Sequence, residues 1–210
     1  KKVNQKQMSL FDGIQNEPIQ ILSKDGEGVY YENIFQKEQG KSVFNNLMQD
    51  VEWEHDELFL FGKKIITKRK VAWYGDEPFD YTYSNATKTA KPWTNDLKKI
   101  KMIVEELSGE TFNSCLLNLY HNGSEGMAWH SDNEKELKKN GTIASVSIGA
   151  VRKFMFKHKE TKETASIVLA SGSLLLMKGE CQTHWLHRLP PTKKTSEPRI
   201  NLTFRTIVKD

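Results

Sequence analysis

The second half of the chain is a succession of short apolar runs with the pattern of β-strands. They begin at residue 111 and are separated by Gly, Asn, Asp or Pro: FNSCLLNLYH, TIASVSIGA, RKFMFKH, SIVLASGSLLLM, THWLH and RINLTFRTI. Several short strands at this spacing favour a sandwich or a barrel. The sequence therefore predicts a mainly β protein, and this pattern constrains the fold more than any other feature.

Two segments before the β-rich region have apolar side chains at helical intervals. The first covers residues 41–54 and the second covers residues 93–107. Thr94 is a candidate N-cap of the second helix, and Gly109 follows its end. We expect both helices to pack on the outside of the β-structure.

The organisation of the chain predicts one compact domain. Residues 1–25 lack sustained apolar periodicity, so we expect a flexible N-terminal arm there. Residues 26–110 would supply the helices, and residues 111–208 would form the β-rich core. A chain of 210 residues is long enough to bury a sizeable core without a disulfide or a structural metal.

The cysteine content and the net charge indicate the compartment and the kind of partner to expect. Cys115 and Cys181 are far apart and form no C-x-x-C pair, which predicts buried thiols in a reducing compartment. The net charge of +4 permits an anionic partner without requiring one. Because the sequence shows neither a signal peptide nor a long apolar run, we expect an intracellular protein without membrane contact. We also expect a monomer. Its place would be the cytoplasm of a bacterium or the nucleus of a eukaryote.

The stretch MAWHSDNE at residues 127–134 contains two potential metal ligands, His130 and Asp132. A His-x-Asp pair is a weak signal by itself, since charged residues are common in proteins. Ser131 followed three residues later by Glu134 is also a capping box, which predicts a short helix reaching Leu137. The stretch alone leaves both interpretations open.

The run PRINLTFR at residues 198–205 gives a second indication of a ligand. Alternate residues of a strand face the same side, so one face carries Arg199, Asn201, Thr203 and Arg205. The solvated face of an edge strand would explain this pattern. A short dicarboxylate would explain it as well. The two arginine Cα atoms lie roughly 20 Å apart, and if both side chains lean inward, the gap between them suits such a ligand. Arginine binds carboxylates through paired hydrogen bonds.

A dicarboxylate site and a His-x-Asp pair together suggest iron chemistry. The arrangement of two histidines and one carboxylate leaves positions on the iron open for a 2-oxo acid and oxygen. THWLH offers His184 and His187 as the third ligand, and strand parity points them to opposite faces without choosing between them. His121 and His158 are poorer candidates.

These motifs resemble the AlkB-type, iron- and 2-oxoglutarate-dependent nucleic-acid demethylases. The resemblance rests on HSD at 130–132, THWLHRLP at 183–190 and PRINLTFR at 198–205, with NLYHNG, IASVSIGA and ASGSLLLM in the same order. It extends from about residue 56 to residue 207, and an FG hairpin motif resembles the subtype that repairs alkylated DNA. The family fold is a double-stranded β-helix, or jelly roll, with flanking N-terminal helices and a nucleotide-recognition lid.

The resemblance implies a set of cofactor residues. His130, Asp132 and His187 would be the Fe(II) ligands, which favours His187 over His184. The co-substrates would be 2-oxoglutarate and O2, and Arg199 would pair with the distal carboxylate of 2-oxoglutarate. The implied 2-oxoglutarate contacts are Asn118, Tyr120, Arg199, Thr203 and Arg205.

The resemblance also implies a lid that holds a flipped base. Phe61 of the hairpin would wedge into the base stack, and Tyr83 with the imidazole of His130 would sandwich the base. Asn133 and Glu134 match positions that contact it. The implied substrate contacts are Leu60, Phe61, Gly62, Lys63, Arg69, Tyr81, Thr82, Tyr83, Ser84, Asn133 and Glu134.

The implied activity is oxidative demethylation of 1-methyladenine and 3-methylcytosine in DNA, with RNA as a second candidate. The methyl group would be hydroxylated and released as formaldehyde, with succinate and CO2 as co-products. Two departures from the family members that act on duplex DNA predict weaker binding of the second DNA strand. Thr192 stands where those proteins have a basic residue before the pair Lys193 and Lys194, and the loop between residues 159 and 166 is shorter and contains acidic residues.

Two alternative functions remain at this point. The metal site fixes the oxidant but not the substrate, so the protein could be a 2-oxoglutarate-dependent hydroxylase or demethylase of protein or lipid. The basic cluster of residues 63–70 beside the lid aromatics weighs against this alternative. The other alternative is a non-catalytic nucleic-acid binding module with structural zinc, although such zinc sites usually have four ligands.

Overall fold

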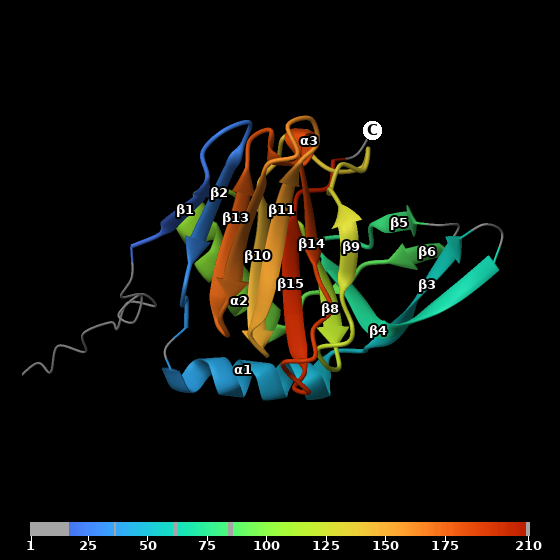
Figure 1. Cartoon of the computed structure of the whole chain (residues 1–210). Helices are drawn as coiled ribbons and strands as arrows, with labels where there is room; N and C mark the ends of the chain where they lie inside the picture. Colours follow the sequence, from blue (N-terminus) through green and yellow to red (C-terminus); the bar gives the residue numbers. More distant parts are fainter. Residues whose placement is uncertain (1–16, 36, 61–62, 84–85, 209–210) are drawn as a thin grey trace, which may run out of the picture.

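Two antiparallel sheets face each other and form the body of the protein (Figure 1). The computed structural model describes residues 17–35, 37–60, 63–83 and 86–208. The helices are α1 (Lys37–Asp50), α2 (Asn95–Ser108) and α3 (Cys181–His184). The strands are β1 (Ile19–Leu22), β2 (Glu27–Tyr31), β3 (Glu54–Leu60), β4 (Lys63–Gly75), β5 (Asp80–Tyr83), β6 (Ala86–Thr89), β7 (Lys91–Pro92), β8 (Ser114–Tyr120), β9 (Met127–His130), β10 (Ile143–Gly149), β11 (Arg152–His158), β12 (Thr164–Leu169), β13 (Ser173–Lys178), β14 (Trp185–Leu189) and β15 (Arg199–Arg205).

The strand order is that of a double-stranded β-helix. The major sheet has the order β1-β2-β13-β10-β15-β8-β4-β3, with β7 pairing to β4, and the minor sheet has the order β12-β11-β14-β9. Strands that are neighbours in space are often distant in sequence, as in the pairing of β10 with β15. The mainly β prediction and the jelly-roll fold class are therefore confirmed.

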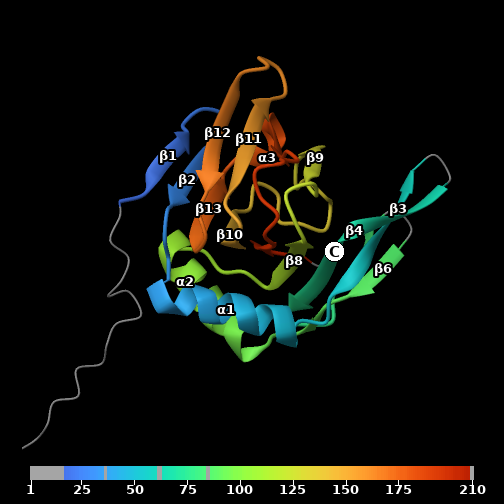
Figure 2. The ribbon, with the colours of Figure 1, turned by 60° about the horizontal axis from the view of Figure 1, so that its bottom comes forward.

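Helices α1 and α2 cover the outer face of the major sheet (Figure 2). Buried side chains of the two helices, including Leu47, Leu97 and Ile100, form one core cluster with the outward apolar residues of the sheet. The Thr94 hydroxyl caps α2 by accepting a hydrogen bond from the Leu97 N–H at 3.3 Å. Gly109 ends the helix in the left-handed region at φ 69°. The second predicted helix and its two caps are confirmed, whereas the first helix spans Lys37–Asp50 in place of the predicted residues 41–54, and residue 54 already belongs to β3.

The three central strands of the major sheet are buried on both faces. On β15, Ile200, Leu202 and Phe204 pack into the cluster under the helices, so the alternate polar residues point between the two sheets. Both arginines of this strand are buried, with Arg199 at 2% and Arg205 at 4% relative exposure. The solvated-edge interpretation of this strand is therefore wrong, because β10 and β8 pair with it on either side.

Two expectations about local structure need correction. The segment 19–22, expected to belong to a loose arm, is strand β1 and pairs with β2 at the edge of the major sheet. Residues 1–16 lie outside the described part of the chain. The predicted helix after Ser131 is also wrong, because residues 131–134 have no regular structure. The Ser131 hydroxyl accepts a hydrogen bond from Lys159 Nζ at 3.2 Å and is therefore engaged away from a helix cap.

Two hairpins project from one side of the body and form the region predicted to be the lid (Figure 1). The first consists of β3 and β4, which pair Leu60 with Lys63. The second consists of β5 and β6, which pair with each other alone. Because β4 continues into the major sheet beside β8, the first hairpin is an extension of the sheet that carries the polar inner face.

Candidate active site

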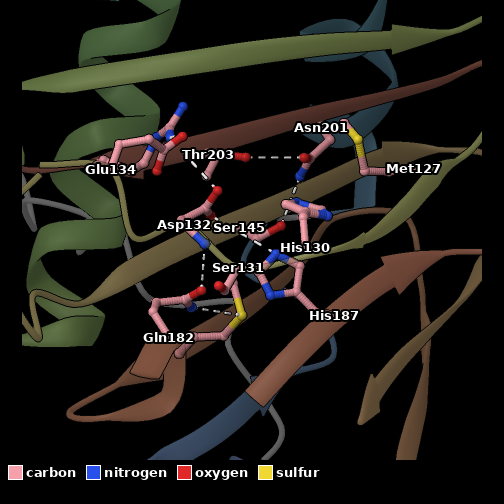
Figure 3. Close-up of polar contacts among 12 residues, drawn as sticks. Met127, His130, Ser131, Asp132, Glu134, Ser145, Gln182, His187, Asn201 and Thr203 are labelled. Atoms are coloured by element: carbon pink, nitrogen blue, oxygen red, sulfur yellow. Dashed lines mark hydrogen bonds and ion pairs between the residues drawn. The ribbon is translucent and has the colours of Figure 1, made fainter. Parts of the chain in front are cut away.

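Three potential metal ligands converge between the sheets: His130, Asp132 and His187. His130 ends β9 and His187 lies directly opposite it on β14, while Asp132 lies in the loop after β9. One ligand atom from each residue lies within 4.8 Å of the other two. Figure 3 shows the three side chains pointing toward one another. Two imidazoles and one carboxylate at this separation fit an octahedral metal with further positions open.

The two imidazoles are held in forms that can donate a lone pair to a metal. The Nδ1–H of His130 donates a hydrogen bond to the Ala128 carbonyl at 2.8 Å, which leaves Nε2 as the free acceptor. His187 is 3% exposed, and burial lowers its pKa to about 4. It is therefore neutral at physiological pH, as a metal ligand must be. Phe154 packs along its ring, with the centroids 5.5 Å apart.

The carboxylate of Asp132 is kept ionised by its surroundings. Burial is the largest single effect and raises its pKa, but Arg205, His187 and His130 together outweigh it, and the pKa lies below the ordinary value. Arg205 Nη1 lies 3.7 Å from Asp132 Oδ1 and 3.7 Å from Glu134 Oε1. The guanidinium thus holds two acidic side chains beside the metal ligands.

A cavity of about 550 Å³ opens from the metal ligands toward the lid. Its wall includes Arg199, whose Nη2 donates a hydrogen bond to Ser147 Oγ at 2.9 Å. Within the described residues the Arg199 Nε and the Asn118 Oδ1 have no hydrogen-bond partner, although both are buried. A buried cation without a carboxylate partner is costly. The unpartnered donor of Arg199 therefore fits a small anionic ligand, and 2-oxoglutarate has the carboxylate that this cation requires.

The other residues predicted for 2-oxoglutarate lie on two paired strands. On β8 and β15, Tyr120 faces Arg199, with the guanidinium carbon 5.4 Å from the ring centroid. Asn118 is paired in register with Asn201, and Thr203 Oγ1 donates to Asn201 Oδ1 at 3.1 Å. All five predicted residues line the same cavity: Asn118, Tyr120, Arg199, Thr203 and Arg205.

Comparison with known proteins decides what kind of site this is. Residues 28–205 match the model of the 2OG-Fe(II) oxygenase superfamily. The chain belongs to this superfamily. The oxygenase is therefore an Fe(II)- and 2-oxoglutarate-dependent enzyme, and His130, Asp132 and His187 form its facial triad.

Two curated relatives and one solved structure illustrate the likeness. DNA oxidative demethylase ALKBH2 of Mus musculus is 40% identical over 198 residues, which cover 89% of this chain and 83% of that protein. Alpha-ketoglutarate-dependent dioxygenase alkB homolog 3 of Homo sapiens is 35% identical over 225 residues, with coverage of 92% and 78%. The structure of OsALKBH1 covers 90% of this chain and 100% of that chain, with a TM-score of 0.61 and 16% identity. At that identity the last comparison shows the fold alone.

Three other histidines and both cysteines of the oxygenase lie outside the triad. His184 belongs to α3, where its Nε2 is 3.6 Å from Glu180, and it is not part of the triad. His158 is bound to Asp25, and His121 to Glu125. Both cysteines are buried free thiols, and burial raises the pKa of the Cys181 thiol to about 12. The choice of His187 over His184 follows from this arrangement.

The predicted substrate contacts of the oxygenase are described only in part. Phe61, Gly62 and Ser84 lie outside the described residues, and for Leu60, Tyr81, Thr82 and Tyr83 the backbone alone is described, in β3 and β5. Arg69 and Glu134 line the cavity, whereas Lys63 and Asn133 are exposed and do not. Arg69 Nη2 lies 2.5 Å from Asp56 Oδ2, so this cation already has an acidic partner in the lid.

Several residues of the site were not predicted from the sequence. Asn201 donates from Nδ2 to Ser145 Oγ at 2.8 Å, and both residues line the cavity. The parity of β15 placed Asn201 on the polar face and was a sufficient signal for it. Gln182 accepts a hydrogen bond from the Asp132 N–H at 2.8 Å, a contact between residues 50 positions apart. No local pattern in the sequence indicates such a contact.

Proposed function

We propose that this oxygenase is an oxidative demethylase that repairs N-alkylated bases in DNA, with 1-methyladenine and 3-methylcytosine as substrates. The observation that carries the proposal is the continuity of the cavity, which runs from the metal triad to basic residues of both lid hairpins. Lys68 and Arg69 of β4 and Lys88 of β6 all line it. The relatives named as a DNA oxidative demethylase and an alkB homolog support the same substrate class.

The cavity suits a base that carries a positive charge. 1-Methyladenine and 3-methylcytosine are cationic, and the acidic groups of Asp132 and Glu134 face the cavity. A methyl group on the pairing edge also weakens base pairing, which makes flipping into the cavity less costly. We assign Glu134 to the recognition of the flipped base and Asn133 to a contact at the rim.

The residues of the core hold the reacting groups in place. His130, Asp132 and His187 would bind Fe(II), and Arg199, with Asn118, Tyr120, Thr203 and Arg205, would bind 2-oxoglutarate. The bound iron, together with 2-oxoglutarate and O2, supplies the oxidation that converts the N-methyl group to N-hydroxymethyl. That group then loses formaldehyde and leaves the unmodified base, while 2-oxoglutarate becomes succinate and CO2. Phe154 and Leu189 line the cavity and help to exclude water from this space.

The lid would bind the nucleic acid around the flipped base. Lys63, Lys64 and Lys68 are exposed on β4, where phosphate groups can reach them. We assign the wedge to Leu60, Phe61 and Gly62, and the sandwich of the base to Tyr83 with His130. Tyr81, Thr82 and Ser84 would complete the contacts of the second hairpin.

The proposal includes the physical state of the enzyme. We propose a monomer, because the residues assigned to the metal and to 2-oxoglutarate all line one cavity of a single chain. Among the described residues, no helix is long and apolar enough to cross a membrane. A repair enzyme of this kind would act wherever the DNA of its cell lies. Light scattering at the concentration of the activity assay tests the monomer.

The test of the proposal follows the mass of a methylated oligonucleotide. The protein is incubated with Fe(II), 2-oxoglutarate, O2 and a single-stranded oligonucleotide containing one 1-methyladenine. The expected result is loss of one methylene mass from the DNA together with formation of succinate. A parallel incubation contains the RNA oligonucleotide of the same sequence. Methyl loss from this RNA alone would show that the substrate is RNA and not DNA. Succinate without methyl loss from either would contradict the proposal and favour a protein or lipid substrate, and neither product would favour a binding module.

A further inference from the structure

Of the three triad residues, Asp132 alone lies outside a strand. His130 and His187 are fixed by the pairing of β9 with β14, which sets their backbones opposite each other. Asp132 follows β9 in a segment without regular structure, residues 131–134. Rotation of the peptide unit before Asp132 would swing its carboxylate away from the imidazoles. Something other than a strand ladder must therefore fix this backbone.

We propose that Gln182 is the positioning residue that orients Asp132 for metal binding. Its Oε1 accepts a hydrogen bond from the backbone N–H of Asp132 at 2.8 Å. Figure 3 shows the Gln182 side chain reaching toward Asp132 along this bond. Because an N–H can only donate, the bond fixes which end of the Gln182 amide faces the loop. The amide nitrogen then points to Met177 Sδ, at 3.5 Å.

Gln182 is itself held firmly enough to position another group. Its side chain is buried, with a residue exposure of 6%. Lys159 Nζ donates to the Gln182 carbonyl at 2.8 Å and to the Ser131 hydroxyl at 3.2 Å. One ammonium group thus joins the backbone of α3 to the residue before Asp132. The loop is held at two consecutive residues by two side chains from other elements.

The position of Gln182 in the chain links two metal ligands. It lies in α3, which runs directly into β14, and His187 follows five residues later. The segment that supplies the third ligand therefore also supplies the group that orients the second. This arrangement explains why the capping-box helix does not form, because Ser131 and the Asp132 N–H are already bonded to Lys159 and Gln182.

The inference can be tested by binding of Co(II), which occupies sites of nitrogen and oxygen ligands and absorbs visible light according to its geometry. Gln182→Met keeps the length of the side chain and removes the acceptor. We expect its Kd for Co(II) to rise about 10–100-fold, as for loss of other groups that orient ligands, and its visible spectrum to change. Gln182→Glu keeps an acceptor oxygen and is expected to restore the wild-type spectrum.

Thr183→Val is the matched control on the same helix. Thr183 is exposed and its hydroxyl contacts Asn140, so this variant should bind Co(II) as wild type does. Thermal unfolding without metal shows whether each variant is folded. If Gln182→Met is not folded, Gln182→Asn replaces it, because the shorter amide keeps the polarity but cannot span to the Asp132 N–H. Wild-type affinity and spectrum in the folded acceptor-free or shortened variant would overturn the inference, as would an equal loss in Thr183→Val.

The Co(II) measurement requires no nucleic acid. A failure of the demethylation proposal would leave the metal spectra unchanged. Conversely, a Gln182→Met variant with wild-type Co(II) binding would remove the positioning role while leaving demethylation by the wild-type protein intact. The two proposals therefore fail separately.

Discussion

The metal site and the lid hold their charged residues in opposite ways. In the site, Arg199 and Arg205 are buried on a strand that is paired on both sides. In the lid, Lys63 and Lys64 are exposed, and the Lys64–Glu57 ion pair lies near solvent. Buried charges of fixed geometry select small ligands, whereas exposed charges attract any polyanion and are screened by salt. The difference supports the proposed division of roles, in which the core carries out the chemistry and the lid binds the nucleic acid.

The largest expected effect comes from breaking the metal site at one histidine. His187→Ala removes a ligand and should abolish both Co(II) binding and succinate formation. His184→Ala is the matched control, because His184 lies on α3 outside the triad and contacts Glu180. It should retain both properties. Equal losses in the two variants would contradict the assignment of the third ligand.

The second prediction removes the buried cation of the core. Arg199→Met leaves the distal carboxylate of 2-oxoglutarate unpaired in a buried site. Loss of one partner of a buried charge pair costs about 2–5 kcal/mol, so the KM for 2-oxoglutarate should rise by at least tenfold. The KM for the oligonucleotide at saturating 2-oxoglutarate should change little. Lys63→Met in the lid should do the reverse, and steady-state kinetics in both substrates separates the two outcomes.

The third prediction uses the pH dependence of stability. Burial lowers the pKa of His187 from 6.5 to about 4, so the unfolded chain binds a proton there more readily than the folded one. The metal-free protein should therefore lose stability as the pH falls from about 6.5 through 4, by about 3 kcal/mol from this group alone. Urea unfolding at several pH values should show a smaller loss in His187→Asn.

Thr183→Val provides the control for that titration, because it leaves every titratable side chain in place and changes only an exposed hydroxyl on α3. This variant should show the same pH dependence of unfolding as the wild type. A pH dependence of unfolding that is unchanged in His187→Asn would contradict a neutral, buried His187.

The smallest predicted effect concerns Asp56, which belongs to a partly buried group of ion pairs in the lid. Asp56 contacts Arg69 at 2.5 Å and Lys88 at 3.4 Å, and so joins β3, β4 and β6. Asp56→Asn should loosen the two hairpins relative to each other and raise the KM for the oligonucleotide a few-fold. The ion pairs of Asp56 in the described part of the chain are with Arg69 and Lys88 and not with a metal or 2-oxoglutarate residue, so Co(II) binding and the KM for 2-oxoglutarate should stay unchanged. A change in either one would show that lid and core are coupled.

The same contrast explains what the sequence could predict. Strand parity and helical spacing located α1, α2 and the polar face of β15, because these patterns depend on neighbours along the chain. Local patterns did not choose between His184 and His187, and the third ligand of the triad came from the resemblance to the AlkB-type family. The helix after Ser131 was predicted wrongly. Lys159 and Gln182, which are distant in the sequence, form hydrogen bonds with the Ser131 hydroxyl and the Asp132 N–H. Local propensity does not indicate contacts between residues that are distant in the sequence. For the same reason the ion pairs of Asp56 in the lid were not predicted.

The most direct measurement is the stoichiometry of products on DNA with a single 1-methyladenine. If the core oxidises the base that the lid delivers, formaldehyde and succinate should form in equal amounts, and the unmodified DNA should match both. The DNA should also increase the rate of succinate formation over that without DNA. Succinate formation that is independent of the DNA, with no formaldehyde and no demethylated product, would contradict the assignment of this oxygenase to DNA repair.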